Sequence, residues 1–451
     1  MPDTPLGCTD VFHLRADQEM RRRAGRANAC VLGLELGGAL EPAALAARVR
    51  EAGWLLPELG WRLRRAAIGD PCWRALGPRT DALEVSARGS GDDDRAWLLA
   101  QLEHGVDGAR PWRLLHRRGR RGDLLVLHWF HPLCDARGAA RLLAWLGAPP
   151  GALEAPPEPG QRFLRPESLL PRSARARTDL ARAYARHAMG FRAPPVVSPF
   201  GLARAASGGR AEALVPWWLE LHVPPLGRLR ALRLHLDPAT TRTFDAGLRA
   251  RARLAETGVL AWAALRLLDR LVARRGLAPR RYVVPIPLSL EPARGGRRFF
   301  GNQVSMMLLA LEREALGDEA TGLAALAEAQ RDIVRRRLDL GMLAAAELSR
   351  RLPEPFYGWL ARRPFGGERG SLVVSHPGVL DVGAFLGVPV VDAWALPAAM
   401  APPGFQVIAS RHRGSFSAWI MFLDGLVSER EVAGEMPAFA RDLCGQPVAP
   451  S

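Results

Sequence analysis

The sequence contains no lysine, and all 62 of its basic residues are arginine. Against 46 acidic residues these arginines give a formal net charge of +16. Such a charge normally favours nucleic acid, an anionic membrane or an acidic substrate as a partner. The many Ala, Gly, Pro and Leu residues are typical of a GC-rich genome, which also replaces lysine by arginine. The charge alone therefore does not indicate a binding function, although a coenzyme A phosphate or an acidic carrier protein would suit it.

Cysteine is scarce, and long apolar runs and recognised nucleic-acid motifs are absent. The five cysteines are odd in number, scattered and without a CxxC pair, so we expect no disulfide framework and a reducing cytoplasm. No stretch of about 18 apolar residues predicts a membrane-spanning helix, and residues 1–18 do not resemble a signal peptide. No basic motif with interleaved aromatics predicts a nucleic-acid partner. The cysteines are Cys8, Cys30, Cys72, Cys134 and Cys444.

The length of 451 residues predicts two lobes rather than one core. Both halves alternate strand and helix patterns, and a Pro/Gly-rich stretch at 147–161 separates them. We expect a first lobe at 1–150, a linker at 151–225 and a second lobe at 226–451. The predicted strands are 29–36, 81–87, 111–117, 123–130, 228–236, 281–290, 302–311, 371–374, 388–393, 405–410 and 415–423. The predicted helices are 41–52, 92–104, 135–146, 173–191, 238–253, 257–274, 316–352 (in large part) and 428–443.

The predicted helix at 173–191 is rich in arginine. Such a helix can lie on an anionic membrane or on an acidic partner protein. A solvated linker helix explains the same pattern without a partner. We therefore keep peripheral membrane contact open beside the expected cytoplasmic location.

The segment most informative about chemistry is 124–143, LLVLHWFHPLCDARGAARLL. An apolar strand ends at His131, and Asp135 opens the next helix four residues later. A neutral imidazole at a strand end can take a proton from an alcohol or amine near neutral pH. Asp135 can cap the helix that follows, and Gly138 permits close packing. Without further support, a structural histidine explains this pattern equally well.

The motif His131-Pro-Leu-Cys-Asp135-Ala136 resembles the HHxxxDG signature of condensation domains, chloramphenicol acetyltransferase and bacterial wax ester synthase/diacylglycerol acyltransferases. The resemblance to the last family extends over nearly the whole chain. Six segments in the same order carry it: 10–14 (DVFHL), 110–112 (RPW), 284–292 (VPIPLSLEP), 301–307 (GNQVSMM), 374–378 (VSHPG) and 402–404 (PPG).

Several positions differ from that family's pattern. Phe130 stands in place of the first histidine, and Ala136 in place of the glycine. Glu256-Thr257 replaces an Asn-Asp pair, Glu291 an arginine and His376 an asparagine. These differences argue against wax ester or triacylglycerol synthesis more than against the fold.

The resemblance implies an α/β fold of two chloramphenicol-acetyltransferase-like lobes, which form a V-shaped pseudo-dimer with the active site at their interface. It implies acyl transfer from a coenzyme A or carrier-protein thioester to a hydroxyl or amine, without another cofactor or a metal, by a monomer. The leading version is wax-ester-synthase-like O-acyl transfer, with His131 as general base and Asp135 holding its loop. The substrate-binding candidates are Gly138, Asn302, Ser305, Ser375 and His376, of which the backbone near Gly138, Asn302 and Ser375 are the candidate oxyanion donors.

Other interpretations remain open. The protein could be a stand-alone condensation enzyme that makes an amide or ester in a natural-product pathway, or a non-catalytic relative that binds a carrier or partner protein. A zinc site could use His128, His131, Cys134 and Asp135, and Cys134 could be a nucleophile. Asn302, Ser305 and His376 could be ordinary polar residues of strands and turns. For Trp112, Trp129, Trp217 and Trp218 we expect packing roles.

Overall fold

The computed structural model describes most of the chain. Its described ranges are 3–65, 70–79, 81–87, 93–103, 105–149, 151–163, 165–191, 196–208, 223–251, 256–291, 298–397 and 400–445. Trp217 and Trp218 lie outside these ranges, so their expected packing role stays a prediction.

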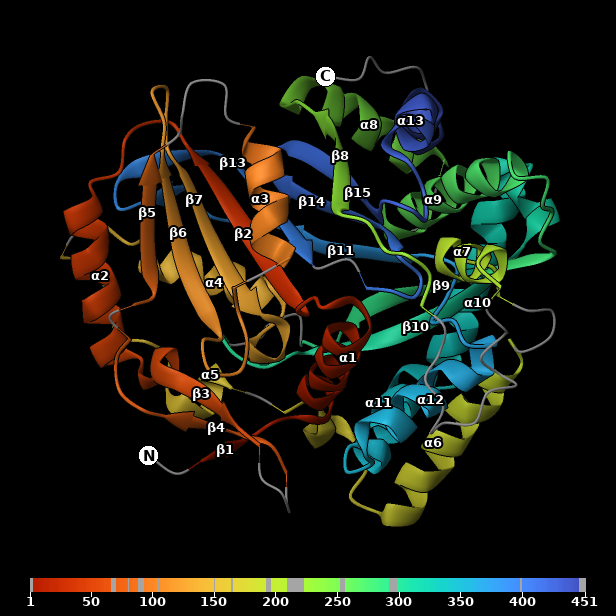
Figure 1. Cartoon of the computed structure of the whole chain (residues 1–451), viewed down its shortest axis with the longest axis horizontal. Helices are drawn as coiled ribbons and strands as arrows, with labels where there is room; N and C mark the ends of the chain where they lie inside the picture. The colour runs from red at the N-terminus through yellow and green to blue at the C-terminus, as the bar shows by residue number, and fades with distance from the viewer. Residues whose placement is uncertain are drawn as a thin grey trace.

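A six-stranded sheet occupies one side of the molecule (Figure 1). Helix α4 covers one face of its central strands and α3 the other, so successive residues of β7 are buried on alternate faces. This explains why β7 reads as one continuous apolar run. The strand order is β12 (Ala384–Phe385), β13 (Val388–Pro397), β2 (Ala29–Leu36), β7 (Leu124–Phe130), β6 (Trp112–Arg118) and β5 (Leu83–Ala87).

A four-stranded sheet and a two-stranded ribbon build the other side (Figure 1). The buried helices α9 and α13 pack in the same core as the four-stranded sheet. The order in this sheet is β11 (Val373–Val379), β14 (Phe405–His412), β15 (Ser415–Leu423) and β8 (Leu229–Leu236). The ribbon pairs β9 (Arg281–Ser289) with β10 (Val304–Glu312), and a small sheet joins β1 (Thr4–Pro5), β4 (Cys72–Ala75) and β3 (Trp61–Arg64).

Strand β13 belongs to the second half of the chain but pairs antiparallel with β2 of the first half. Residues 388–397 thereby extend the sheet that the first half builds, and they connect the two sides through backbone hydrogen bonds. The division of the chain at 150 and 225 stays a prediction.

Helices surround the two sheets (Figure 1). They are α1 (Cys8–Ala24), α2 (Pro42–Leu55), α3 (Asp94–Glu103), α4 (Ala136–Leu146), α5 (Pro159–Arg162), α6 (Ala174–Met189), α7 (Pro199–Ala206), α8 (Pro238–Arg251), α9 (Glu256–Ala273), α10 (Glu319–Arg335), α11 (Leu338–Ser349), α12 (Glu354–Arg362) and α13 (Glu429–Cys444).

Most predicted elements are confirmed to within a few residues, and the α/β class is confirmed. The long helix expected over 316–352 is two helices, because Arg337 adopts a left-handed backbone (φ 53°) between α10 and α11. Helix α1 was not predicted. It buries Thr9, Asp10, Asp17 and Glu19, which hides the apolar periodicity that identifies other helices.

Helix α1 lies where the two sides of the molecule meet (Figure 1). It contacts the turn that follows β7 on one side and α11 and α12 on the other. Glu19 forms ion pairs with Arg362 and Arg369 of the second half. Helix α1 thus brings first-half side chains to the junction that contains the candidate site.

Candidate active site

A pocket with a cavity volume of about 150 Å³ lies between elements of the two halves. His131 is one of its lining residues. The first half contributes His13, Cys30, Trp129, His131, Asp135, Ala136 and Arg137. The second half contributes Pro287, Ser289, Val304, Met306, Ser375, His376, Pro377, Ala395, Leu396, Pro397 and Ile408.

His131 begins a one-turn 3-10 helix directly after β7. Its backbone N–H donates to the carbonyl of Asn28 at 3.0 Å, and its carbonyl accepts from Asn302 Nδ2 at 3.0 Å. Its Nδ1 is buried without a partner in the described structure, which leaves Nε2 as the nitrogen for pocket chemistry. Burial lowers the pKa of His131, and hydrogen bonding and the Asp135 charge oppose that shift only in part. The ring is therefore neutral at pH 7, as a base requires.

The ring of His13 from α1 stacks on the ring of His131, with centroids 3.5 Å apart and planes 13° from parallel. Burial, followed by the charges of His131 and Arg369, lowers the pKa of His13 as well. Two neutral imidazoles thus line one pocket. His13 lies in the 10–14 segment of the family resemblance, but the sequence predicts no role for it, because nothing local links residue 13 to residue 131.

Asp135 fixes the turn that carries His131. One carboxylate oxygen accepts from the N–H of Gly138 at 2.9 Å and caps α4, and the other accepts from the N–H of Gln303 at 3.0 Å. Trp129 Nε1 donates to the carbonyl of Cys134 at 2.8 Å. Since both oxygens of Asp135 are engaged with backbone, its geometry is that of a positioning residue.

A buried pair formed by Asp10 and Asn302 supports the same turn. Asn302 is fully buried, and its Nδ2 donates to Asp10 Oδ1 at 2.8 Å and to the carbonyl of His131. Burial raises the pKa of Asp10 to about 7, although hydrogen bonds from Asn302 and Gly7 lower it. The role of Asp10 was not foreseen, because its partner lies 292 residues away.

Three of the substrate-binding candidates do not line the pocket. The N–H of Gly138 is held by Asp135, and a Cβ at Gly138 would lie 2.7 Å from the Phe299 carbonyl oxygen. Both N–H groups of the Asn302 amide are used within the protein, and Ser305 Oγ donates to the carbonyl of Asp339. The polar groups of Gly138, Asn302 and Ser305 thus serve the fold, and their contact with substrate stays a prediction.

Ser375 and His376, the other two candidates, do line the pocket. They lie in β11, where a register shift between Ser375 and Gly378 interrupts the pairing with β14. Neighbouring residues of a regular strand point to opposite faces, but this irregularity lets Ser375, His376 and Pro377 all reach the pocket. Of the candidate oxyanion donors, Ser375 is thus the one that lines the pocket.

The described structure gives no support to the metal and nucleophile alternatives. His128 Nδ1 accepts from Arg113 Nε at 3.0 Å within the sheet, so that nitrogen is not free to bind zinc. Burial raises the pKa of the Cys134 thiol well above its usual range, which keeps it protonated, and Cys134 does not line the pocket.

One cluster of possible metal ligands occurs among the described residues, and it consists of Cys8, Glu167 and Glu347. Arg350 lies 3.7 Å from Glu167 and 3.2 Å from Glu347, so an arginine already balances these carboxylates. Burial also raises the pKa of the Cys8 thiol.

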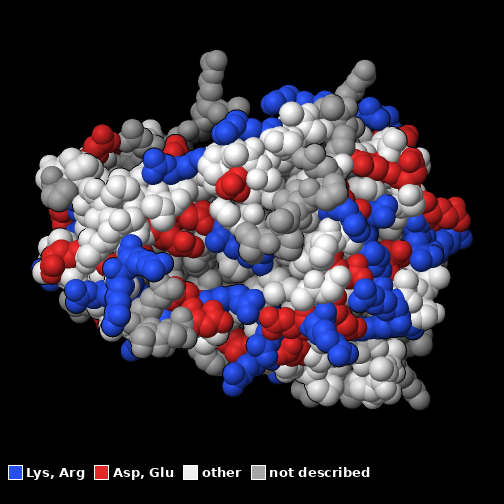
Figure 2. Space-filling model, turned by 90° about the horizontal axis from the view of Figure 1, so that it is seen from above, with Lys and Arg blue, Asp and Glu red and all other residues white. Residues whose placement is uncertain are grey.

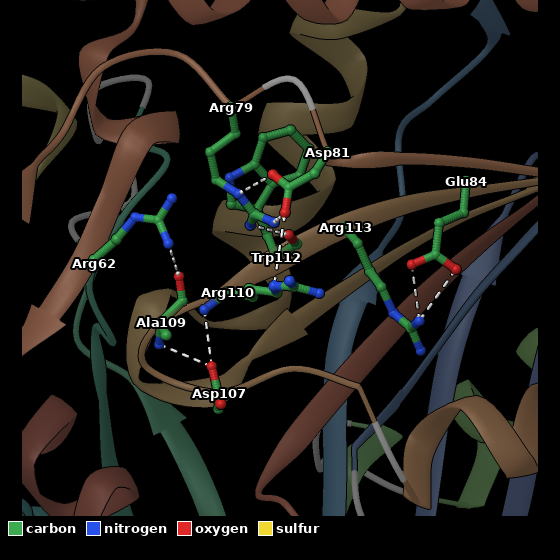
Figure 3. A network of polar contacts seen from close by, with 9 residues as sticks. All are labelled: Arg62, Arg79, Asp81, Glu84, Asp107, Ala109, Arg110, Trp112 and Arg113. Carbon is green, nitrogen blue, oxygen red and sulfur yellow. Dashed lines mark hydrogen bonds and ion pairs between the residues drawn. The ribbon is translucent and has the colours of Figure 1, made fainter.

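The segment before β6, which carries the Arg-Pro-Trp motif, has a structural role (Figure 3). Trp112 is buried, and its Nε1 donates to the carbonyl of Leu59 at 2.7 Å. Arg79 donates to the carbonyl of Trp112 and to Asp81, and Arg113 of β6 pairs with Glu84 of β5 (Figure 3). This network ties neighbouring strands together, which confirms packing for Trp112. Trp129 is also buried, but its ring forms part of the pocket wall.

A second pocket, with a cavity volume of about 470 Å³, adjoins the first. Met306 lines both pockets, and Phe12 of the second precedes His13 of the first. Its wall is mainly apolar and comes from α6, α11, α12 and neighbouring strands. The lining residues include Tyr184, Ala188, Met189, Met306, Leu308, Met342, Ala345, Ala346, Tyr357, Leu360 and Phe365.

The surface charge is mixed where it can be seen. Figure 2 shows arginine and acidic side chains interspersed over one face rather than an unbroken basic patch.

Helix α6 packs along α11 with Ala181 and Ala188 buried, while Arg175, Arg182 and Arg186 are exposed. In the described part of the chain, every helix is too short or too polar to traverse a bilayer. Membrane contact through α6 stays a prediction.

Comparison with solved structures identifies proteins of similar fold. The sequence matches no protein-family model, and no curated protein matches it. The first condensation domain of the calcium-dependent antibiotic synthetase, solved with a substrate analogue, is 17% identical, with a TM-score of 0.71 over 100% of this chain and 98% of that one.

Two other solved structures have the same fold. Trichothecene 15-O-acetyltransferase from Fusarium sporotrichioides is 11% identical, with a TM-score of 0.69 over 99% of this chain and 95% of that one. The starter condensation domain of rhizomide synthetase, solved with C8-CoA and Leu-SNAC, is 13% identical. Its TM-score is 0.65 over 99% of this chain and 96% of that one. The expected α/β pseudo-dimer of the condensation-domain and chloramphenicol-acetyltransferase type is thereby confirmed.

Proposed function

We propose that the protein is an acyltransferase that moves an acyl group from a coenzyme A or carrier-protein thioester to a hydroxyl or amine. The observation that carries this proposal is the neutral imidazole of His131 in a pocket between the two halves. The fold shared with condensation domains and an O-acetyltransferase supports it. The same geometry makes a partner-binding role without catalysis the weaker interpretation.

In the proposed reaction the acceptor oxygen or nitrogen attacks the thioester carbonyl carbon while Nε2 of His131 takes its proton. The carbon–sulfur bond then breaks, and the imidazolium returns the proton to the leaving thiolate. Ser375 is the proposed hydroxyl donor to the oxyanion. Holding donor and acceptor together in one pocket supplies much of the rate gain. Asp135 and Asn302 contribute by fixing the His131 turn.

The adjoining apolar pocket is the proposed site for the acyl chain of the donor. Its walls are mainly apolar side chains, and Met306 connects it to the His131 pocket. Burial of each methylene contributes roughly 0.8 kcal/mol, so a chain of eight or more carbons would bind much more tightly than acetyl.

In its narrower form the proposal is O-acyl transfer to a long-chain alcohol, as in wax ester synthases. The alternative form is ester or amide formation in a natural-product pathway. The polar side chains Ser375, His376 and Arg137 in the pocket favour this alternative, since a plain fatty alcohol offers them no second polar group.

The test offers acetyl-, octanoyl- and palmitoyl-CoA to the purified protein with 1-octanol, 1-hexadecanol, 1,2-octanediol or octylamine as acceptor. Thiol release and mass spectrometry of the product measure transfer. We expect ester or amide formation with the longer donors, and a loss of about 10²- to 10⁴-fold in His131→Ala. The matched control is His235→Asn, whose histidine contacts Ser417 and lies outside the pocket. Absence of transfer with every pair, or unchanged turnover in His131→Ala, would refute the proposal.

A further inference from the structure

Two positions that depart from the wax ester synthase pattern contact each other, and one of them, His376, lines the pocket. His376 Nε2 lies 3.2 Å from Glu256 Oε1, although the two residues are 120 positions apart. Both positions have asparagine in that family's pattern. Two asparagines would form a neutral contact, whereas here a carboxylate meets an imidazole.

Glu256 is held firmly in place. It lies in the first turn of α9, where the helix dipole favours a negative charge. Arg411 Nε donates to both of its oxygens, at 3.1 and 2.9 Å, and the same guanidinium also binds Asp245 of α8. Burial raises the pKa of Glu256, but the hydrogen bond and charge of His376, followed by the charge and hydrogen bond of Arg411, outweigh burial, so the net direction is downward. Glu256 is thus a fixed carboxylate.

A fixed carboxylate determines which nitrogen of a histidine carries the proton. With Nε2–H donating to Glu256, the lone pair of His376 lies on Nδ1. Among the described residues no partner binds Nδ1, and Nδ1 is not among the fully buried polar atoms. The ring of His376 lies near-parallel to that of Phe416 and lines the same pocket as His131.

We propose that Glu256 and His376 form a polar anchor that accepts a hydrogen bond from a second hydroxyl or amino group of the acyl acceptor, one that is not acylated. The anchor rests on the proposed function, since it assigns the acceptor class of the same site. The acceptor is therefore a compound with two polar groups, such as a diol or an amino alcohol, rather than a plain fatty alcohol. An unpaired acceptor in a pocket discriminates strongly against a ligand that lacks the matching donor.

The kinetic test compares 1,2-octanediol with 1-octanol as acceptors for octanoyl-CoA. The wild-type protein should prefer the diol in kcat/KM by at least about tenfold. Glu256→Gln and His376→Asn should reduce that preference to about twofold or less. His235→Asn should keep the wild-type preference. Equal use of the two acceptors by the wild type, or an unchanged preference in both variants, would overturn the anchor. A preference for 2-hydroxyoctanoate over the diol would also overturn it, by indicating an imidazolium.

A second measurement needs no turnover and so separates the anchor from the proposed function. In protein with ¹⁵N-labelled histidine, the His376 signals are assigned by their loss in His376→Asn. We expect the Nε2–H tautomer, and an Nδ1 shift that moves on addition of 1,2-octanediol but not of 1-octanol. The opposite tautomer, or no movement with the diol, overturns the anchor. If these shifts occur but no acyl transfer is found, the acyltransferase proposal fails and the binding site stands.

Discussion

His131 has the surroundings of a base that stays neutral in moderately acidic solution. Its Nδ1 is buried, its ring stacks on His13, and burial lowers its pKa below the ordinary value. A base with a lowered pKa loses its proton at a lower pH than an exposed histidine does. The pH at which activity declines therefore reports on this burial.

We expect kcat/KM to stay constant as the pH falls from 8 to 6.5, and to decline about tenfold per unit only below the lowered pKa of His131. The measurement is the rate of thiol release from octanoyl-CoA across this range, with circular dichroism at each pH as a control for folding. A midpoint at or above 6.5 would contradict the assignment of His131 as a buried base.

At the scale of elements, the active turn is a junction between β7, α4 and the chain that leads into β10. Asp135 joins them, since it caps α4 and also binds the N–H of Gln303. Asp318 is a simpler counterpart at the start of α10, where it is exposed and caps one helix. The two aspartates therefore separate the contribution of a cap from that of a junction.

Asp318→Ala should lower the free energy of unfolding by about 1 kcal/mol, the usual effect of losing an N-cap. Asp135→Ala should lower it by at least about 1 kcal/mol more, because the N–H of buried Gln303 loses its partner. Urea unfolding of both variants measures the difference. Equal losses would indicate that Asp135 is only a cap and does not fasten the His131 turn to the second half.

At the scale of the whole molecule, buried histidines connect stability to pH. Burial lowers the pKa of five of them, so below about pH 6.5 the unfolded chain binds protons that the folded chain excludes. Asp10 acts in the opposite direction. Its pKa of about 7 lets the folded chain keep a proton between roughly pH 4 and 7 that the unfolded chain has lost. The five are His13, His128, His131, His187 and His235.

The five histidines outweigh the three carboxyl groups whose pKa is raised by burial (Asp10, Asp17 and Glu347), so unfolding should take up protons and the free energy of unfolding should fall as the pH drops from 7.5 to 5.5. The slope is about 1.4 kcal/mol per pH unit for each net proton. Urea midpoints at the two pH values provide the measurement. In His128→Gln, which removes one such group from the sheet, the fall should be smaller. A higher midpoint at pH 5.5 would contradict this account.

Features that depend on near neighbours in the chain are predictable from the amino-acid sequence. Continuous apolar runs at 29–36 and 124–130 predict buried strands, and Asp135 predicts a capped helix shortly after His131. A resemblance spread over six segments was enough to predict the fold class, although each segment alone was weak.

Which side chains line the pocket together depends on the tertiary structure. The ring of His13 stacks on that of His131, Asp10 supports the same turn through Asn302, and Glu256 contacts His376. Gly138, Asn302 and Ser305 do not line the pocket. These contacts join residues more than one hundred positions apart. Their energies come from burial and from hydrogen bonds formed when the two halves meet, and no local periodicity carries that information.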